Sequence, residues 1–306
     1  MNLNVTNKII KKSRRWQKKT GFSLFQFVAN HFEKKKEAAV FGVIDKLNVR
    51  SAHTVYEPTS ENSNIIWICW FQGLDSAPEL VKRCIDSVKK NCSGSKIFII
   101  SDDNFSNYVS LPHNIIGKYN SGLIGKAHFS DILRCCLLHK YGGVWLDATI
   151  FMTRELSHLF LNRPFCSLRF KHPEKYGSTS NGFWTTYFLA SEKNGYLIGR
   201  VKTLLINYWQ KNDMAIDYFL MDYVFKFLFE KDPLARGIIL SQPELGENRF
   251  LLKNNMSKTC SSELMDKFEQ DAIGVYKLSY KEHYCLTNND QPTLYSKILD
   301  GSFSLS

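Results

Sequence analysis

Four polar side chains within twenty residues are the strongest candidates for chemistry in this chain. They are Asp131, Arg134, Asp147 and Thr149, in the stretch HFSDILRCCLLHKYGGVWLDAT. Asp131 and Arg134 are three residues apart, so both lie on one side of a predicted helix, where they can bind a common ligand. The alternative is an ordinary surface ion pair between these two side chains, which contributes less than ~1 kcal/mol.

Asp147 and Thr149 point to phosphate chemistry. A carboxylate in an apolar, β-rich strand is costly unless a cation or hydrogen-bond donors pair with it. A carboxylate and a hydroxyl two residues apart on one side of a strand suit a hard divalent cation that also binds phosphate oxygens. Such a cation would stabilise the charge on a departing diphosphate. The alternative is that Asp147 caps a turn and Thr149 is an ordinary β-former.

The elements that position these residues follow a repeated strand–helix–strand pattern. Apolar periodicity predicts strands over 65–71, 96–104 and 144–151, and helices over 78–92 and 126–140, the last ending at Gly142 and Gly143. In the strand over 144–151, Trp145, Asp147 and Thr149 face one way and the even-numbered residues the other. This order predicts an α/β fold with a mostly parallel sheet and helices on both faces. Ligands bind such sheets at the carboxyl ends of the strands.

The net charge of +11 is concentrated at the N-terminus. Residues 1–50 hold twelve Lys and Arg against three Asp and Glu, which leaves only +2 for the rest of the 306-residue chain. We predict a basic helical extension over 1–55 and a catalytic domain over 56–306. The main body therefore does not resemble a nucleic-acid-binding surface. Residues 1–36, with aromatic residues among the cations, either contact an anionic membrane or form a solvated helix packed on the body.

Cysteine usage and hydropathy indicate a cytoplasmic protein. The eight cysteines show no C-x-x-C or Cys/His spacing, which predicts reduced core residues. No apolar run approaches the ~20 residues that span a bilayer, and no signal-peptide pattern follows the N-terminal charges.

Four segments carry a resemblance to a known family. IIWICWFQG, SDILR followed by YGGVWLDAT, IDYFLMD and KLSYK resemble the capsular polysaccharide synthesis family of bacterial glycosyltransferases. These are related to the D-x-D glycosyltransferases, which include yeast initiating mannosyltransferases and clostridial glucosylating toxins. The resemblance implies a Rossmann-like glycosyltransferase A-type fold, a nucleotide-sugar donor (a UDP-sugar is expected), Mn²⁺ or Mg²⁺, and retention of anomeric configuration.

The same resemblance assigns roles to matching positions. Trp70 would stack on the nucleotide base, and Asp131 and Arg134 would contact the donor sugar. Asp147 matches the first aspartate of the signature, whereas Thr149 replaces the second. Asp131, Arg134 and Asp147 are therefore the predicted catalytic residues, and Asp147 and Thr149 the predicted metal ligands. The loss of one carboxylate weakens the predicted metal site.

Further residues are weaker candidates. Asn104 would contact the nucleotide, although a turn cap accounts for it equally well. Trp184 and Asp222 would contact the acceptor. The alternatives are core packing for the tryptophan and an exposed acid on a core helix for Asp222. Lys281 or His283, in the segment KLSYKEHYC, would return over the diphosphate or a metal.

Together these features predict a cytoplasmic hexosyltransferase, peripheral on the inner face of the cell membrane. It would move a sugar from a nucleotide donor to a lipid-linked capsular or surface polysaccharide acceptor, without binding nucleic acid. Two alternatives remain at this point. One is a sugar-phosphate transferase, which releases nucleoside monophosphate, and the other is a non-catalytic basic protein that binds membranes or nucleic acid.

Overall fold

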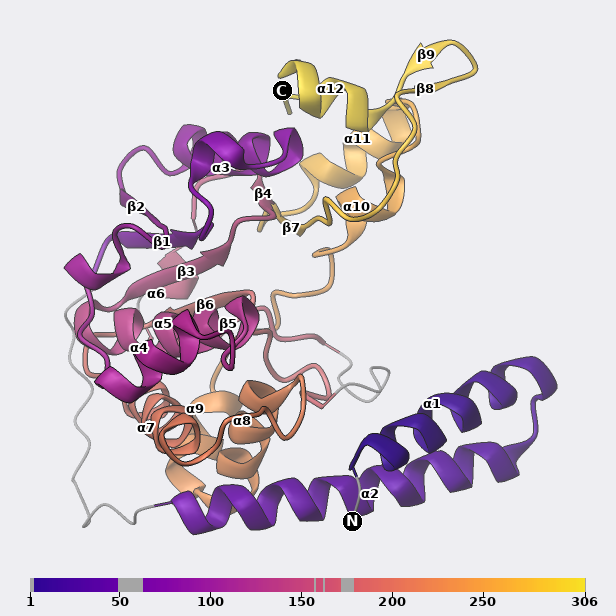
Figure 1. Cartoon of the computed structure of the whole chain (residues 1–306). Coiled ribbons are helices and arrows are strands. Elements are labelled where there is room, and N and C mark those ends of the chain that lie inside the picture. Colours follow the sequence, from indigo (N-terminus) through magenta and orange to yellow (C-terminus); the bar gives the residue numbers. More distant parts are fainter. Residues whose placement is uncertain (1–2, 49–62, 157, 162, 172–178, 306) are drawn as a thin grey trace.

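The computed structural model describes residues 3–48, 63–156, 158–161, 163–171 and 179–305 (Figure 1). The helices are α1 (Leu3–Thr20), α2 (Ser23–Leu47), α3 (Glu79–Asn91), α4 (His113–Asn120), α5 (Lys126–Tyr141), α6 (His158–Leu161), α7 (Tyr196–Lys211), α8 (Leu220–Lys231), α9 (Pro233–Leu240), α10 (Leu251–Asn255), α11 (Ser262–Glu269) and α12 (Leu294–Asp300). The strands are β1 (Ile65–Cys69), β2 (Lys96–Ile100), β3 (Gly143–Asp147), β4 (Ile150–Met152), β5 (Phe165–Ser167), β6 (Phe188–Ser191), β7 (Val275–Lys277), β8 (Thr287–Asn288) and β9 (Gln291–Pro292).

The central sheet has the strand order β2-β1-β3-β6-β5. β1 pairs in parallel with β2 and with β3, whereas β6 is antiparallel to both β3 and β5. Strands β2, β1, β3 and β5 therefore share one direction and only β6 opposes them. This confirms the predicted α/β fold with a mostly parallel sheet, flanking helices and N-terminal helices.

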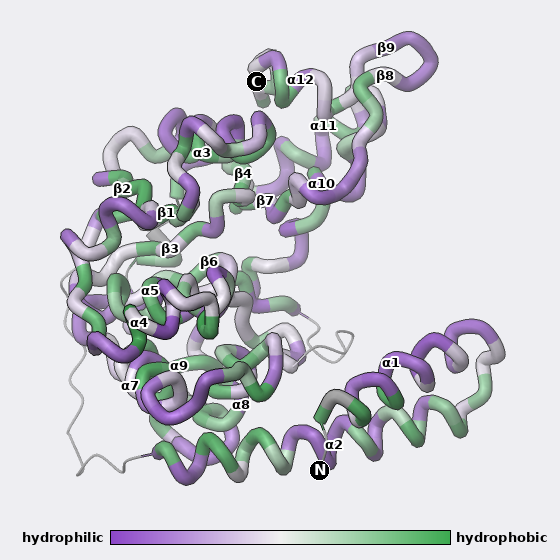
Figure 2. The backbone as a smooth tube through the Cα atoms, viewed as in Figure 1, coloured by the Kyte–Doolittle hydropathy of each residue, from purple (hydrophilic) through white to green (hydrophobic). Residues whose placement is uncertain are grey.

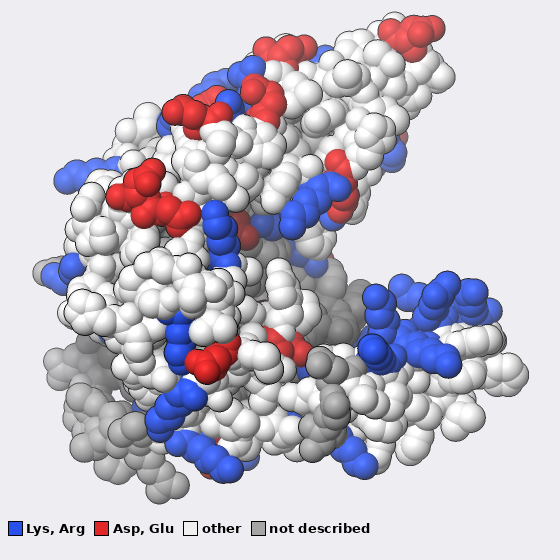
Figure 3. Space-filling model, viewed as in Figure 1, with Lys and Arg blue, Asp and Glu red and all other residues white. Residues whose placement is uncertain are grey.

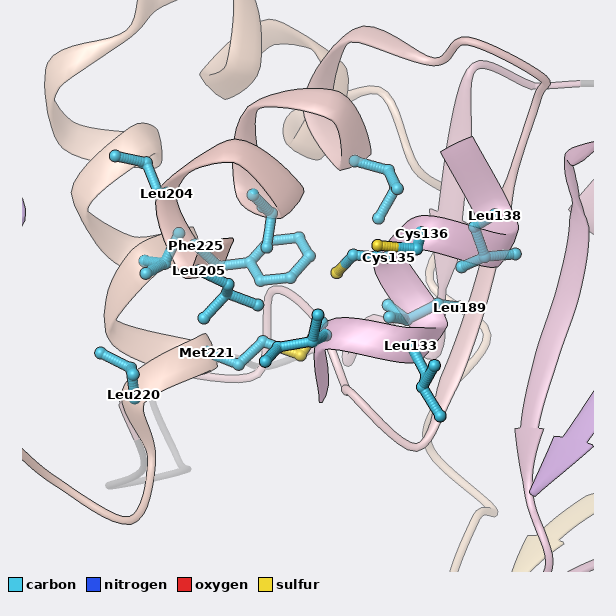
Figure 4. Close-up of a cluster of buried hydrophobic side chains, with 14 of the residues drawn as sticks. Leu133, Cys135, Cys136, Leu138, Leu189, Leu204, Leu205, Leu220, Met221 and Phe225 are labelled. Atoms are coloured by element: carbon cyan, nitrogen blue, oxygen red, sulfur yellow. The ribbon is translucent and has the colours of Figure 1, made fainter. Parts of the chain in front are cut away.

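The two faces of the sheet are covered by different helices because successive side chains of each strand point to opposite sides. Trp67 and Trp145 pack on the face covered by α5, α7 and α8, while Ile66 and Val144 pack on the face covered by α3. Figure 2 shows the central strands as mainly apolar. In Figure 4, the apolar side of α5 meets side chains of β6, α7 and α8. The predicted helix over 126–140 is thus a core helix along one side and polar along another.

Two glycines make the sharp joint between α5 and β3. Gly142 and Gly143 have φ angles of 72° and 94°, in the region that favours glycine. A Cβ on Gly143 would lie 2.3 Å from the backbone oxygen of Ile65, and one on Gly142 would lie 2.8 Å from the backbone nitrogen of Lys193. The glycine pair therefore does more than end the helix, because it lets β3 approach β1 closely enough to pair.

The strand predicted over 144–151 is wrong at its carboxyl end. β3 ends at Asp147, where its parallel partner β1 also ends, and a turn at residues 148–149 follows. The chain then enters a separate two-stranded sheet, in which β4 pairs with β7, with Ile150 opposite Lys277. The separation matters for the site because it brings a segment from the far end of the sequence next to Asp147 and Thr149.

The N-terminal helices form a hairpin that projects from the body (Figure 1). Val40 and Ile44 of α2 are buried in the main core, and Lys36 makes a 2.6 Å ion pair with Asp217, just before α8. The first half of α2 instead pairs with α1. The predicted boundary at residue 55 lies outside the described residues. None of the described helices combines the length and the hydropathy needed to cross a bilayer.

Candidate functional site

A cavity of about 690 Å³ lies beyond the carboxyl ends of β1 and β3. Its walls come from α5, the turn after β3, the start of α8 and the segment after β7. Seven residues predicted from the sequence line it together: Trp70, Asp131, Arg134, Asp147, Thr149, Asp222 and Lys281. Their positions in the chain span more than 150 residues, so the fold brings them together at the edge of the sheet where α/β proteins bind ligands. Their roles in binding or catalysis stay predictions.

Asp147 is the centre of a network of cations. Its Oδ2 lies 2.8 Å from the Nζ of Lys277, and its Oδ1 lies 3.6 Å from Nη2 of Arg134. The indole Nε1 of Trp145 donates to Oδ1 at 3.1 Å. Burial by itself would raise the pKa of Asp147, but the charges of Lys277 and Arg134 and the hydrogen bonds from Lys277 and Trp145 lower it to about 2. The carboxylate is therefore ionised at neutral pH and holds two cations at the cavity wall.

Arg134 joins α5 to the strand ends. Its guanidinium donates to the carbonyl of Thr186 and to the hydroxyl of Ser130, and it lies over the ring of Trp145, 5.0 Å from the centroid. Oδ1 of Asp131 forms an ion pair with the same guanidinium, 3.4 Å from its Nη2. The side chain of Arg134 is only 8% exposed. Arg134 is thus a fixed positive charge, and the carboxylate of Asp131 beside it also faces the cavity.

Trp70 directly follows β1 and lies on the cavity wall. The ring of Tyr280, from the segment after β7, meets it edge-on with centroids 5.4 Å apart. The indole Nε1 of Trp70 is buried and has no acceptor among the described residues. The predicted stacking residue therefore lies at the cavity, and its indole N–H makes no hydrogen bond within the described structure.

Lys277 is the main residue that the sequence reasoning missed. Its Nζ binds Asp147 and also the Oγ1 of Thr149, at 2.7 Å. It lies 130 residues from Asp147, so no local spacing links the two positions. The available signal was the segment KLSYK itself, whose first lysine is Lys277. The segment does return to the cavity, with Lys281 on the lining.

His283, in contrast, does not lie with the predicted metal ligands. Its side chain is exposed, and it is not part of the cavity lining. The chain turns away from the cavity after Lys281, because the next buried residue, Tyr284, packs into the C-terminal core. The structure therefore does not bring His283 together with Asp147 and Thr149, the other predicted metal ligands.

Asn104 is a turn cap instead of a nucleotide contact. Its Oδ1 accepts from the backbone nitrogen of Ser101 at 2.9 Å, and its Nδ2 donates to the carbonyl of Ile99 at 2.9 Å. Both ends of the amide are therefore engaged after β2, and Asn104 is not among the residues that line the cavity.

Of the two predicted acceptor residues, Asp222 lies at the cavity and Trp184 lies in the core. Asp222 lines the cavity, whereas Trp184 is 2% exposed and stacks on Phe225 in the core. The predicted acceptor contact from Trp184 is therefore wrong, because core packing covers its ring. Its Nε1 donates to Oδ1 of Asp222 at 3.0 Å. Burial raises the pKa of Asp222 to about 6, despite that hydrogen bond.

Two aromatic residues that the sequence reasoning did not select stand at the cavity beside Asp222. Tyr218 is 69% exposed and Phe219 51% exposed, and both contribute to the lining. Their rings meet edge-on with centroids 5.1 Å apart. Exposed rings at a polar cavity are suited to stacking on an apolar sugar face or a lipid portion of a ligand.

The donor set does not fit the predicted Mn²⁺ or Mg²⁺ site. The described residues contain no group of three or more His, Cys, Asp or Glu that could hold a metal ion. The two predicted ligands, Asp147 and Thr149, share the ammonium of Lys277. Mg²⁺ can be held by one or two carboxylates together with phosphate oxygens and water, but the one carboxylate at this position is already paired with Lys277 and Arg134.

Comparisons with known proteins agree with the sequence motifs. Two curated fungal proteins match with 26% identity: "Glycosyltransferase afumC" of Aspergillus fumigatus over 178 residues, and "Probable glycosyltransferase FCK3" of Fusarium pseudograminearum over 166 residues. The matches cover 51% and 50% of this chain and 41% of each relative, so the chain spans about two fifths of their length. The solved structure "PaToxG Glycosyltransferase" aligns with 16% identity and a TM-score of 0.41, over 79% of this chain and 95% of that one.

The family assignment rests on a match to most of the chain. A model described as "Capsular polysaccharide synthesis protein" matches residues 21–298, from the start of α2 to the last helix. This range includes every residue that lines the cavity. The chain therefore belongs to the capsular polysaccharide synthesis protein family.

Proposed function

We propose that this chain is a glycosyltransferase that moves a sugar from a nucleotide-sugar donor to a lipid-linked surface polysaccharide acceptor. The observation that carries the proposal is the common cavity of Trp70, Asp131, Arg134 and Asp147 at the strand ends. Its volume of about 690 Å³ is within the range of small-molecule sites. A protein built only to bind through its basic extension would have no need of these groups.

The donor would lie along the wall formed by β1, α5 and β3. The nucleotide base stacks on Trp70, whose side chain lines the cavity. The diphosphate lies toward Lys277 and Arg134, and the sugar hydroxyls donate to Asp131. Hydrogen bonds of this buried kind discriminate well between sugars. A UDP-sugar is our first choice of donor, from the family resemblance.

The reaction would retain the anomeric configuration. The bond between sugar C1 and the phosphate oxygen breaks, and its electron pair stays on the diphosphate. The acceptor hydroxyl attacks C1, and its proton passes to the leaving diphosphate. This route needs no separate base beside the acceptor. The residues of this chain orient both substrates and hold positive charge where negative charge develops.

The acceptor would enter beside Tyr218, Phe219 and Asp222, on the side of the cavity where α2 is anchored. The ion pair between Lys36 and Asp217 connects that helix to the residue before Tyr218. The N-terminal hairpin would thus hold the cavity mouth near a membrane that carries the acceptor lipid.

Charge and apolar exposure on the hairpin support this membrane contact. Figure 3 shows Lys and Arg side chains gathered over α1. Phe22, Leu24 and Phe27 are 66%, 65% and 69% exposed at the tip of the hairpin and the start of α2. Basic residues contribute about 1 kcal/mol each near an anionic leaflet, and apolar residues add insertion. We place the protein on the cytoplasmic face of the cell membrane.

A donor-hydrolysis screen tests the enzyme. Purified protein is incubated with a panel of nucleotide sugars, and the released nucleotide is identified by chromatography. We expect one donor to release nucleoside diphosphate, and Asp131→Asn to slow that release by more than tenfold. Asp103→Asn, an exposed carboxylate on the loop after β2, is the matched control. Failure of the folded protein to release nucleotide from any donor would overturn the proposal.

The same screen distinguishes sugar transfer from sugar-phosphate transfer. Sugar transfer releases nucleoside diphosphate, whereas sugar-phosphate transfer releases nucleoside monophosphate.

Vesicle co-sedimentation tests whether the N-terminal hairpin binds membranes. The double variant Lys18→Glu/Lys19→Glu should lose binding to anionic vesicles while hydrolysing the donor in solution as the parent does. Equal binding of parent and variant, or binding to neutral vesicles alone, would contradict the electrostatic contact.

A further inference from the structure

Lys277 occupies the position at which the sequence predicts a divalent cation. Its Nζ lies 2.8 Å from Oδ2 of Asp147 and 2.7 Å from Oγ1 of Thr149. These are the two oxygen atoms of the D-A-T signature that would coordinate the metal. The ammonium of Lys277 therefore contacts both oxygens with a positive charge, as a metal ion bound between them would.

The fold builds this placement into the backbone. β7 ends at Lys277 and pairs with β4, with Lys277 opposite Ile150. The backbone nitrogen of Leu278 donates to the carbonyl of Thr149 at 2.9 Å, and that of Lys277 donates to the carbonyl of Arg249 at 2.7 Å. Hydrogen bonds on both sides of the residue fix the origin of its side chain. The ammonium is thus delivered to Asp147 by strand pairing.

The surroundings favour a single positive charge over a divalent one. Arg134 lies on the other oxygen of Asp147, at 3.6 Å. A divalent cation bound between Asp147 and Thr149 would be repelled by Lys277 and Arg134, and the other nearby carboxylate, Asp131, is already paired with Arg134 at 3.4 Å. The hydroxyl of Thr149 adds no charge. In this chain, the hydroxyl of Thr149 instead of a second carboxylate leaves Asp147 as the only negative charge that Lys277 contacts directly in the described structure.

The ammonium keeps capacity for a ligand. Of its three N–H donors, two are used by Asp147 and Thr149. The side chain of Lys277 is 21% exposed and forms part of the cavity lining. One N–H can therefore meet a phosphate oxygen in the cavity. The charge is pre-oriented before a ligand binds, which is the condition for effective electrostatic stabilisation.

We propose that Lys277 replaces the divalent cation of the D-x-D glycosyltransferases, so that a lysine held by Asp147 and Thr149 stabilises the departing diphosphate. The proposal rests on the proposed sugar transfer for its reaction. The C1–oxygen bond breaks, the leaving diphosphate receives the electron pair and the acceptor proton, and Lys277 stays protonated throughout. Asp147 acts in this scheme as a positioning residue for the ammonium.

The first experiment measures Mn²⁺ binding directly, without turnover. Electron paramagnetic resonance of Mn²⁺ is recorded with the full-length protein, alone and with UDP. We expect no bound Mn²⁺ beyond that held by UDP itself. We expect the double variant Thr149→Asp/Lys277→Ala, which restores two carboxylates and removes the ammonium, to bind Mn²⁺ at least tenfold more tightly. Tight Mn²⁺ binding by the parent that is lost in Asp147→Asn would overturn the proposal.

The second experiment uses donor hydrolysis. The parent should keep its rate within twofold after EDTA treatment, and Lys277→Ala should lose at least a hundredfold, with partial recovery in Lys277→Arg. Lys267→Ala is the matched control, because this exposed lysine pairs only within α11, with Glu263. Loss of the parent's activity in EDTA and its return with Mn²⁺ would refute the inference.

The two experiments separate this inference from the proposed function. If no donor is hydrolysed, the sugar-transfer proposal fails, while the Mn²⁺ measurement still decides whether the D-A-T position binds metal. If Lys277→Ala does not fold, the parent's response to EDTA and its Mn²⁺ spectrum still give the answer.

Discussion

Replacement of Asp147 by Asn tests the cation network at the cavity wall. Asn has the shape of a protonated Asp, so Asp147→Asn reports the free energy that the ionised carboxylate adds to folding. The pKa of Asp147 falls from 3.8 to about 2 in the folded protein. A shift of nearly two units corresponds to about 2 kcal/mol at pH 7. We therefore expect the variant to be less stable than the parent by about that amount.

The pH dependence of this stability difference follows from the direction of the pKa shift. A lowered pKa in the folded state means that the stabilisation is complete well above pH 4 and is lost as the pH falls toward 2. The difference between parent and Asp147→Asn should be constant from pH 7 to pH 5 and fall to about half at pH 3. Urea unfolding followed by circular dichroism at each pH measures it. Asp103→Asn, at an exposed position, should change stability by less than about 0.5 kcal/mol.

The reasoning fails if Asp147→Asn is as stable as the parent at pH 7. That result would mean that the cost of burying Asp147, Lys277 and Arg134 cancels their attraction, as happens for some buried ion pairs. A difference that grows below pH 4 would also contradict the direction of the pKa shift.

Three further predictions concern separate parts of the site. Trp70→Ala should weaken nucleotide binding by about 1–3 kcal/mol, the contribution of base stacking on an aromatic ring; calorimetry with UDP measures it, and unchanged affinity would remove Trp70 from the site. Gly143→Ala should prevent folding or lower the melting temperature by more than 10 °C, since its Cβ would lie 2.3 Å from a backbone oxygen of β1. Gly94→Ala, where a Cβ meets nothing within 4 Å, should fold normally, and equal melting temperatures would contradict the steric argument. Asp222→Asn should be more stable than the parent at pH 7, by up to about 3 kcal/mol, because a carboxyl pKa raised to about 6 makes stability fall as pH rises from 4 through 6; a variant less stable at pH 7 in urea unfolding would refute this.

Local sequence patterns were sufficient for the fold class and for much of the site. The apolar runs and helical periods predicted the presence and type of β1, α3, β2 and α5, because these elements depend on burial along short segments. The strands predicted over 65–71 and 96–104 were too long, since they end at Cys69 and Ile100. The Gly-Gly break predicted where α5 ends. Asp131, Arg134, Asp147 and Trp70 were selected from motifs, and they do line one cavity.

The errors at Trp184 and at the end of β3 occurred where the deciding neighbour is remote in sequence. Trp184 was a reasonable acceptor residue from its aromatic context, but only packing against α8 shows that its ring is covered. Asn104 was undecided between a ligand contact and a cap, and its hydrogen bonds identify it as a cap. The end of β3 depends on where β1 stops, which no feature of residues 144–151 reveals.

The sequence by itself determined the α/β fold class, the basic helical N-terminal extension and the presence of a carboxylate in the strand that follows α5. Only the tertiary structure decided which cation faces that carboxylate. The pairing of β4 with β7 brings Lys277 to Asp147 across 130 residues, and strand pairing over such a distance is set by the packing of the whole chain. A motif shows which ligands are available, but the charge that binds them depends on which distant segment packs against it.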